Sequence, residues 1–237
     1  MFFIVIGIGL IFLAFYFFYR KRLIQSIPTS KIRSLAMGLV EIYGEVVPMN
    51  KTLKTPFTFL DCVYYRYCVE ELRQSGKNSH WVTIKKGEDS SLFYLRDETG
   101  SVLINPSKAK IDIPVDNVFH SGLHRDPPAG VKQFLFNYSI DHKGYFFGIN
   151  KTLKYSEWFI APKDKLYILG TAADNPYREE GTAHDSIEDV MITKGKHQKI
   201  FLISDKHEQE ILKNLNNRFI TVFVIGMVLL LLGLWML

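Results

Sequence analysis

The chain begins and ends with a long apolar run that carries no charged side chain. Each run is 19 residues long, Met1–Tyr19 and Phe219–Leu237. A helix of that length measures about 28 Å, close to the thickness of the hydrocarbon core of a bilayer. We therefore predict a transmembrane helix at each end. This pattern argues against a polytopic transporter, a disordered tail and a purely soluble protein.

The first run could also be a signal peptide. A signal peptide has positive charge before its apolar part and a small-residue cleavage site after it. Here the basic residues Arg20, Lys21 and Arg22 follow the run, and none precedes Phe2. We therefore expect a retained anchor.

Basic residues beside the two runs predict how the chain crosses the membrane. All 29 Lys and Arg residues and all 24 acidic residues lie between the runs. Because basic flanks stay in the cytoplasm, we predict a two-pass protein of the cell membrane, with the middle region cytoplasmic and both termini outside. The flanking residues that favour this orientation are Arg20, Lys21, Arg22, Lys31, Arg33, Lys206, Lys213 and Arg218.

The charge pattern also bears on partners. Arg20, Lys21 and Arg22 lie where they could contact anionic lipid headgroups. The formal net charge is +5, but acidic and basic residues interleave and no basic run contains aromatic residues. We therefore expect the membrane as a partner and no nucleic acid.

The two cysteines lie in a segment whose pattern is typical of one strand. Apolar and polar residues alternate through Asp61–Leu72, which contains Cys62 and Cys68. Six residues along a strand separate the thiols by about 20 Å, whereas a disulfide needs Cα atoms within about 7 Å. We predict two reduced, packed thiols, in agreement with a cytoplasmic domain.

Period-two alternation predicts further short strands in the middle region. In Leu39–Val47, four residues share one face: Val40, Ile42, Gly44 and Val46. The turn Asp97–Gly100 should join two strands as a hairpin, with its glycine able to take a positive φ. The other predicted strands are Trp81–Ile84, Ser91–Leu95, Ser101–Ile104, Lys110–Ile113, Lys165–Leu169, Val190–Ile192 and Lys199–Ile203.

Helical signals between the two runs are few. We predict a short helix over Lys31–Met37, capped by Thr29 or Ser30, and a second one over Pro128–Phe136. Asp174–Asp189 is polar and is predicted to be a surface loop. The predicted fold is mainly β: a single β-sandwich or barrel-like domain with short helices, flanked by two transmembrane helices. The expected divisions are residues 1–19, 20–203, 204–218 (a helical linker) and 219–237.

Candidate chemistry is sparse. His120 and His124 have the spacing of metal ligands on a helix, but Gly122 between them favours an exposed loop. The pair His184-Asp185 falls in the polar loop, where chance adjacency is the simpler interpretation. We therefore predict no catalytic residue, no metal and no cofactor. Three residues remain candidates for a buried or interfacial polar network: Arg66, Glu70 and Glu157.

The order of several motifs resembles the GIDE domain family, also called the beside-a-membrane domain. The segments that carry this resemblance are Pro28–Arg33, Gly38–Gly44, Cys62–Arg66 with Glu70, Leu95–Leu103, Tyr155–Ile160, Leu166–Gly170 and Ile203–Asp205. The resemblance covers nearly all of residues 20–218. It implies structural roles for the motif residues Gly44, Arg66, Glu70, Asp97, Gly100, Glu157 and Gly170.

The best-known members of that family are membrane ubiquitin ligases that carry a zinc-binding RING after the second span. This sequence has only two cysteines, too few for the zinc ligands of a RING. It is more similar to the RING-less prokaryotic-type members, whose domain is interpreted as an interaction module. We therefore expect a non-catalytic scaffold with an as yet unidentified protein partner, rather than an enzyme.

Two alternatives stay open. The chain could be a component of a ubiquitin-ligase-like system whose catalytic part is another chain. It could also be a lipid- or small-ligand-sensing β-domain, as suggested by the aromatic segments Tyr64–Tyr67, Phe134–Phe136 and Tyr145–Phe147.

Overall fold

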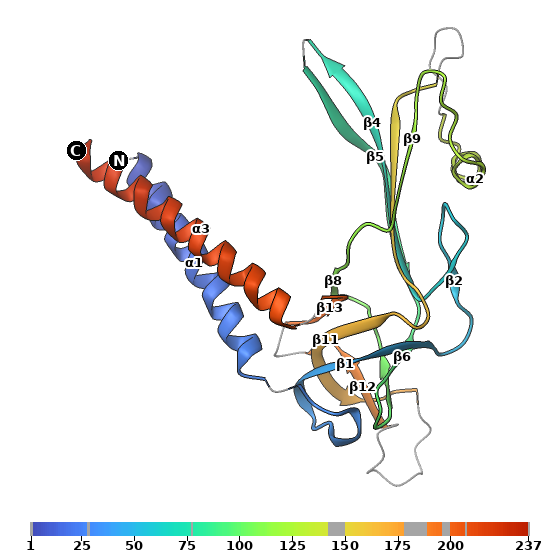
Figure 1. Ribbon diagram of the computed structural model, residues 1–237, viewed down its shortest axis with the longest axis horizontal. Helices are drawn as coiled ribbons and strands as arrows, with labels where there is room; N and C mark the ends of the chain where they lie inside the picture. Colours follow the sequence, from blue (N-terminus) through green and yellow to red (C-terminus); the bar gives the residue numbers. More distant parts are fainter. Residues whose placement is uncertain are drawn as a thin grey trace.

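The computed structural model describes residues 2–27, 29–76, 78–141, 150–177, 189–195, 200–206 and 208–236. Figure 1 shows two long helices joined to a body made of sheets. The elements in chain order are α1 (Phe2–Gln25), a 3₁₀ turn (Ile32–Ser34), β1 (Gly38–Pro48), β2 (Leu53–Lys54), β3 (Asp61–Cys62), β4 (Tyr64–Ser75), β5 (Asn78–Ser90), β6 (Phe93–Arg96), β7 (Ser101–Ile104), β8 (Lys110–Asp112), β9 (Asn117–Ser121), α2 (Ala129–Asn137), β10 (Leu153–Ile160), β11 (Lys165–Asp174), β12 (Val190–Thr193), β13 (Leu202–Ser204) and α3 (Glu208–Trp235).

Five strands close into a small barrel. They follow one another in the order β1-β6-β7-β12-β11, and β11 pairs back with β1 from Gly38↔Ala172 to Glu45↔Lys165. Within this ring only the β12–β7 pair is parallel. β13 and β8 extend the sheet beyond β11. The predicted mainly β fold is confirmed. Of the two predicted architectures, sandwich and barrel, the structure has the barrel.

The barrel interior is apolar because alternate residues of each strand point inward. On β1 the residues Val40, Ile42 and Val46 are buried in this core, as their period-two spacing predicted. The other strands contribute mostly large apolar residues, among them Phe93, Leu95, Ile104, Leu166, Ile168, Ile192 and Ile203.

A second sheet stands on the barrel and has four antiparallel strands in the order β5-β4-β10-β9. Figure 1 shows α2 on one side of this sheet and the helix pair on the other. The side facing α2 is buried in an aromatic cluster that includes Phe57, Tyr67, Phe134 and Tyr155. Packing against α2 explains why Pro128–Phe136 was predictable as a helix with one apolar side.

The terminal helices pack against each other, and Figure 1 shows both termini at the same end of the pair. A Cβ on Gly7 would lie 2.9 Å from the Gly226 carbonyl oxygen, and one on Gly233 would lie 2.9 Å from the Ile4 nitrogen. Glycine therefore lets the two backbones approach closely, a kind of contact that is typical of helix pairs within membranes. Both helices are long and apolar enough to cross a membrane.

Some local predictions were wrong. Lys31–Met37 is not a helix but a single 3₁₀ turn, and Lys31 caps it without a side-chain hydrogen bond. Asp61–Leu72 is not one strand: the chain bends at Val63, whose N–H donates to the Ile160 carbonyl, so β3 pairs with β2 and β4 pairs with β10. His120 lies on strand β9 rather than in a loop.

Strands β9 and β10 were not among the predicted strands, and β5 is far longer than Trp81–Ile84. The apolar and polar residues of β9 and β10 alternate poorly because Ser121, Ser156 and Glu157 are buried there, and a bulge interrupts the β4–β5 pairing. The pair His184-Asp185, the aromatic segment Tyr145–Phe147 and most of the predicted loop Asp174–Asp189 lie outside the described residues.

Candidate functional site

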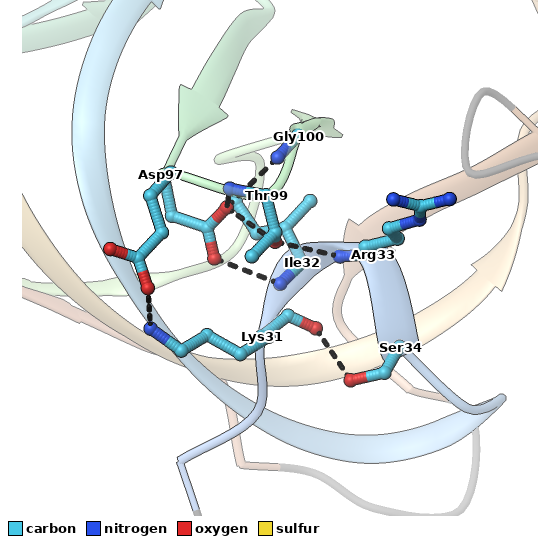
Figure 2. Close-up of polar contacts among 8 residues, drawn as sticks. Lys31, Ile32, Arg33, Ser34, Asp97, Thr99 and Gly100 are labelled. Carbon is cyan, nitrogen blue, oxygen red and sulfur yellow. Dashed lines mark hydrogen bonds and ion pairs between the residues drawn. The ribbon is translucent and has the colours of Figure 1, made fainter.

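Asp97 fastens the segment that follows α1 to the β6–β7 turn (Figure 2). Its carboxylate accepts hydrogen bonds from the N–H of Ile32 at 2.9 Å, of Thr99 at 2.6 Å and of Gly100 at 3.0 Å. The Thr99 hydroxyl also donates to it at 2.6 Å and accepts from the Arg33 N–H at 3.1 Å. These bonds hold the 3₁₀ turn in place of the predicted helix.

The electrostatics of Asp97 follow from these bonds. Burial by itself raises the pKa of the Asp97 carboxyl, but the donors from Ile32, Thr99 and Gly100 outweigh it and leave the pKa below its ordinary value. Gly100 does not have a positive φ, so the predicted reason for a glycine there was wrong. Its backbone N–H, which any residue but proline has, makes the contact.

A cavity of about 620 Å³ lies beside this cluster, and we call it the motif cavity. Its charged groups are mixed, and two pairs are already neutralised within it: Lys31 with Glu98, and Arg96 with Glu45 at 3.1 Å. Such a lining does not select for one sign of ligand charge. The lining residues are Thr29, Ser30, Lys31, Tyr43, Gly44, Glu45, Arg96, Asp97, Glu98 and Lys165.

Two motif glycines sit where barrel strands approach each other closely. A Cβ on Gly44 would lie 2.5 Å from the carbonyl oxygen of Arg96. A Cβ on Gly170 would lie 2.7 Å from Ile192 Cγ2. Real Cβ atoms do not come so near, so both positions need glycine for barrel closure.

Glu157 is fully buried and ties three segments together. Its carboxylate accepts from the Phe57 N–H and the Thr58 hydroxyl, each at 2.7 Å, and from the Asn117 amide at 3.3 Å. These donors satisfy the carboxylate oxygens within the protein, so Glu157 links the loop at Phe57 and Thr58 to the four-stranded sheet.

Arg66 and Glu70 lie on the opposite side of the four-stranded sheet from Glu157. In the β4–β10 register Arg66 faces Trp158 and Glu70 faces Lys154, whereas Glu157 faces Tyr67 of the aromatic cluster. Because neighbouring residues of a strand point to opposite faces, the three predicted network residues do not meet.

The side that carries Arg66 and Glu70 is not covered by α2, and we call it the open face. The Arg66 guanidinium stacks on the Trp158 ring at 4.5 Å, and Lys154 forms an ion pair with Glu70 at 3.1 Å. Lys154 Nζ also lies 5.9 Å from the Trp81 ring, which contacts His120. The open face consists of Arg66, Glu70, Trp81, His120, Lys154 and Trp158.

The open face is hollowed near the edge strand β5. The hollow has a volume of about 480 Å³. Its lining residues are Arg66, Tyr67, Cys68, Lys86, Gly87, Glu88 and Trp158. The sequence pattern alone did not identify four residues as members of one surface: Trp81, Trp158, Lys154 and Lys86. The even spacing of Lys154 and Trp158 on β10 was the available signal, whereas Trp81 and Lys86 share this face only because a bulge shifts the β4–β5 register between them.

The two cysteines and several of the aromatic residues that the sequence singled out are partly or fully buried. Both cysteines are free, with Cys62 buried and Cys68 half-buried. Burial, followed by the charge of Glu157, raises the pKa of the Cys62 thiol to about 12. Tyr64, Tyr67 and Phe134 are core residues, which accounts for much of the aromatic richness without a ligand.

The part of the chain that the structure describes holds no group of three or more His, Cys, Asp and Glu arranged for a metal. A family model described as GIDE, E3 ubiquitin ligase, matches residues 64–237, which is most of the chain. The chain belongs to the GIDE family. Neither the search of curated proteins nor that of solved structures gave a match.

The GIDE match runs from the start of β4 through the second apolar helix. It includes six of the motif residues: Arg66, Glu70, Asp97, Gly100, Glu157 and Gly170. Gly44 and the segments Pro28–Arg33 and Gly38–Gly44 precede it. The GIDE region therefore contains the whole open face and three of the four hydrogen bonds to the Asp97 carboxylate; the fourth comes from Ile32.

Proposed function

We propose that this GIDE protein is a membrane-anchored, non-catalytic interaction module, and that its open face binds a protein partner. The observation that carries the proposal is the open face itself. It presents the exposed Trp81 ring and the partly buried Trp158 ring, with an Arg and a Lys, on a sheet whose back is fixed by α2. Tryptophan and arginine on a rigid support are the residue types that dominate binding energy at protein interfaces.

The position of the open face adds to this proposal. α2 and the helix pair lie on opposite sides of the four-stranded sheet (Figure 1), so the open face looks toward the side on which the helices run. An anchored domain that faces its membrane meets membrane-bound partners at a raised effective concentration.

Photocrosslinking tests the open face directly. We would place a photoreactive residue at Thr83, which is exposed and pairs with Glu70, and a matched one at Gln133 on the far side of α2. In native membranes we expect a discrete protein adduct from position 83 only, and its loss on Trp158→Ala. Equal adducts from both positions, or none from position 83, would refute the proposal.

A second candidate function rests on the family description. Because the GIDE model is described as an E3 ubiquitin ligase, the chain could be a subunit of a ligase-like system with its catalytic part elsewhere. This candidate predicts that the purified chain binds a ubiquitin-conjugating enzyme. Failure to bind one, together with an open-face adduct of another kind, would leave the interaction module as the function.

We also propose that the domain faces the cytoplasm. Arg20, Lys21 and Arg22 lie on the last turns of α1, and α3 carries Lys213 and Arg218 just before its apolar part. Basic residues at the domain end of both helices support a cytoplasmic domain with both termini outside.

A further inference from the structure

A small cleft gathers basic side chains from four segments where the helix pair meets the barrel. Arg20 comes from α1, Lys110 from β8, Lys206 from the bend after β13, and Arg218 from α3. We call this the basal cleft; its volume is about 130 Å³. Figure 1 shows β8 and β13 at the foot of α3.

The basal cleft has an excess of positive charge. Among the residues that line it, the carboxylate is that of Asp112, and it lies 3.6 Å from Lys206 Nζ. Within the described part of the chain, no carboxylate pairs with Arg20, Lys110 or Arg218. Cations that converge without counterions favour a bound anion.

The floor of the basal cleft is apolar. It is made by Ile24, Leu202, Ile211 and Leu215, which belong to the cluster that joins the helix pair to the barrel. Arg20 and Arg218 are the charged residues that immediately border the two apolar runs. In an anchored chain they therefore lie at the depth of the lipid headgroups.

We propose that the basal cleft binds a phosphate group and that an anionic phospholipid supplies it. The phosphate oxygens accept hydrogen bonds from Arg20, Lys110 and Arg218, while the lipid's glycerol region covers the apolar floor. This inference rests on the proposed membrane anchoring and not on the proposed protein partner. Free phosphate has the same chemistry, so the experiment separates the two sources.

The test counts bound lipids by native mass spectrometry on the full chain. The chain is taken from nanodiscs of phosphatidylcholine with and without phosphatidic acid, and separately from detergent with inorganic phosphate. We expect one retained phosphatidic acid per chain, with affinity falling roughly tenfold or more in Lys110→Gln/Arg218→Gln. The matched control, Arg22→Gln/Lys213→Gln, removes the same charge from residues of α1 and α3 that do not line the cleft, and it should bind normally.

Asp112→Asn guards against a folding artefact. It removes the carboxylate beside Lys206, so we expect phosphatidic acid to bind about threefold more tightly, a gain that misfolding cannot produce. Equal losses in the cleft pair and the control pair would overturn the proposal. Cleft-dependent binding of inorganic phosphate at the same affinity would support the phosphate site but assign it to free phosphate. A chain found in the soluble fraction would instead refute the anchoring.

Discussion

At the scale of single residues, the half-buried carboxylate of Asp97 and the buried one of Glu157 hold segments that are distant in sequence. Asp97 receives the Ile32 N–H across 65 positions of the chain, and Glu157 receives the Phe57 N–H across 100. A carboxylate can accept several hydrogen bonds at once, so a single side chain can bind backbone N–H groups of several segments. These structural hydrogen bonds account for Asp97 and Glu157 as motif residues without a catalytic role.

The substitution Asp97→Asn tests this role. The amide keeps one acceptor oxygen but loses the charge, so we expect the free energy of unfolding to fall by about 1 kcal/mol. Because folding lowers the pKa of Asp97, its stabilisation is full above the ordinary aspartate pKa of about 4 and is lost as the pH falls through the folded-state pKa. Denaturation of the detergent-solubilised chain at pH 7 and pH 3 measures it, with exposed Asp89→Asn as the control. A deficit that stays the same at pH 3 would contradict the charge-based reason.

The two thiols should differ in reactivity. Because the thiolate is the nucleophile, the buried Cys62, with a pKa of about 12, should react with iodoacetamide at pH 8 at least about a hundredfold more slowly than Cys68. Mass spectrometry of the native chain should show one fast modification, and Cys68→Ser should abolish it. Fast labelling that survives Cys68→Ser would show that Cys62 is accessible.

At the scale of elements, barrel closure depends on close strand approach. β1 pairs with β11 along one edge and with β6 along the other, and Gly44 lies next to Glu45, the residue that both pairings share. No side chain fits there because the Arg96 carbonyl occupies the space. The four-stranded sheet lacks this constraint and can extend as a long hairpin.

Comparing Gly44→Ala with Gly100→Ala distinguishes a motif glycine that is needed for close strand approach from one that is not. Gly44→Ala should lower the free energy of unfolding by about 1–3 kcal/mol, because the new Cβ overlaps the Arg96 backbone. Gly100→Ala should change it by less than about 0.5 kcal/mol, since its Cβ would lie 3.6 Å from Ile32 Cγ2 at an ordinary φ. Chemical denaturation of both variants measures the difference. Equal losses would mean that the β6–β7 turn needs glycine after all.

At the scale of the whole molecule, the helix pair determines how the domain is held. Both helices leave the barrel from the same region, and the cluster of Ile24, Tyr167, Leu169, Leu202 and Ile211 joins them to it. If both helices cross a membrane, as we propose, two attachments of this kind restrict rotation of the domain over the bilayer. In the proposed anchored chain, the open face and the basal cleft would therefore keep fixed positions relative to the membrane.

The orientation predicted from the basic flanks can be measured with reporter fusions. Alkaline phosphatase fused after Leu237 should be active in a bacterial host, because the chain end lies outside if the domain is cytoplasmic. A fluorescent protein inserted after Asn175, at the exposed end of β11, should then be fluorescent. Reversal of both signals would place the domain outside the cell and remove the basis for a cytoplasmic partner.

The sequence by itself determined those features of the fold that depend only on residues close together in the chain. The uncharged terminal runs, the inward face of β1, the turn at Asp97 and the helix near Pro128 all follow from local periodicity and composition. Only the tertiary structure decided the rest. Barrel closure, the separation of Glu157 from Arg66 and Glu70, the replacement of a helix by the 3₁₀ turn on Asp97, and the basal cleft each join segments far apart in the chain. A local sequence pattern cannot predict such contacts. Which strand pairs with which, and which side chains pack together, depends on residues of other segments that are distant in the sequence.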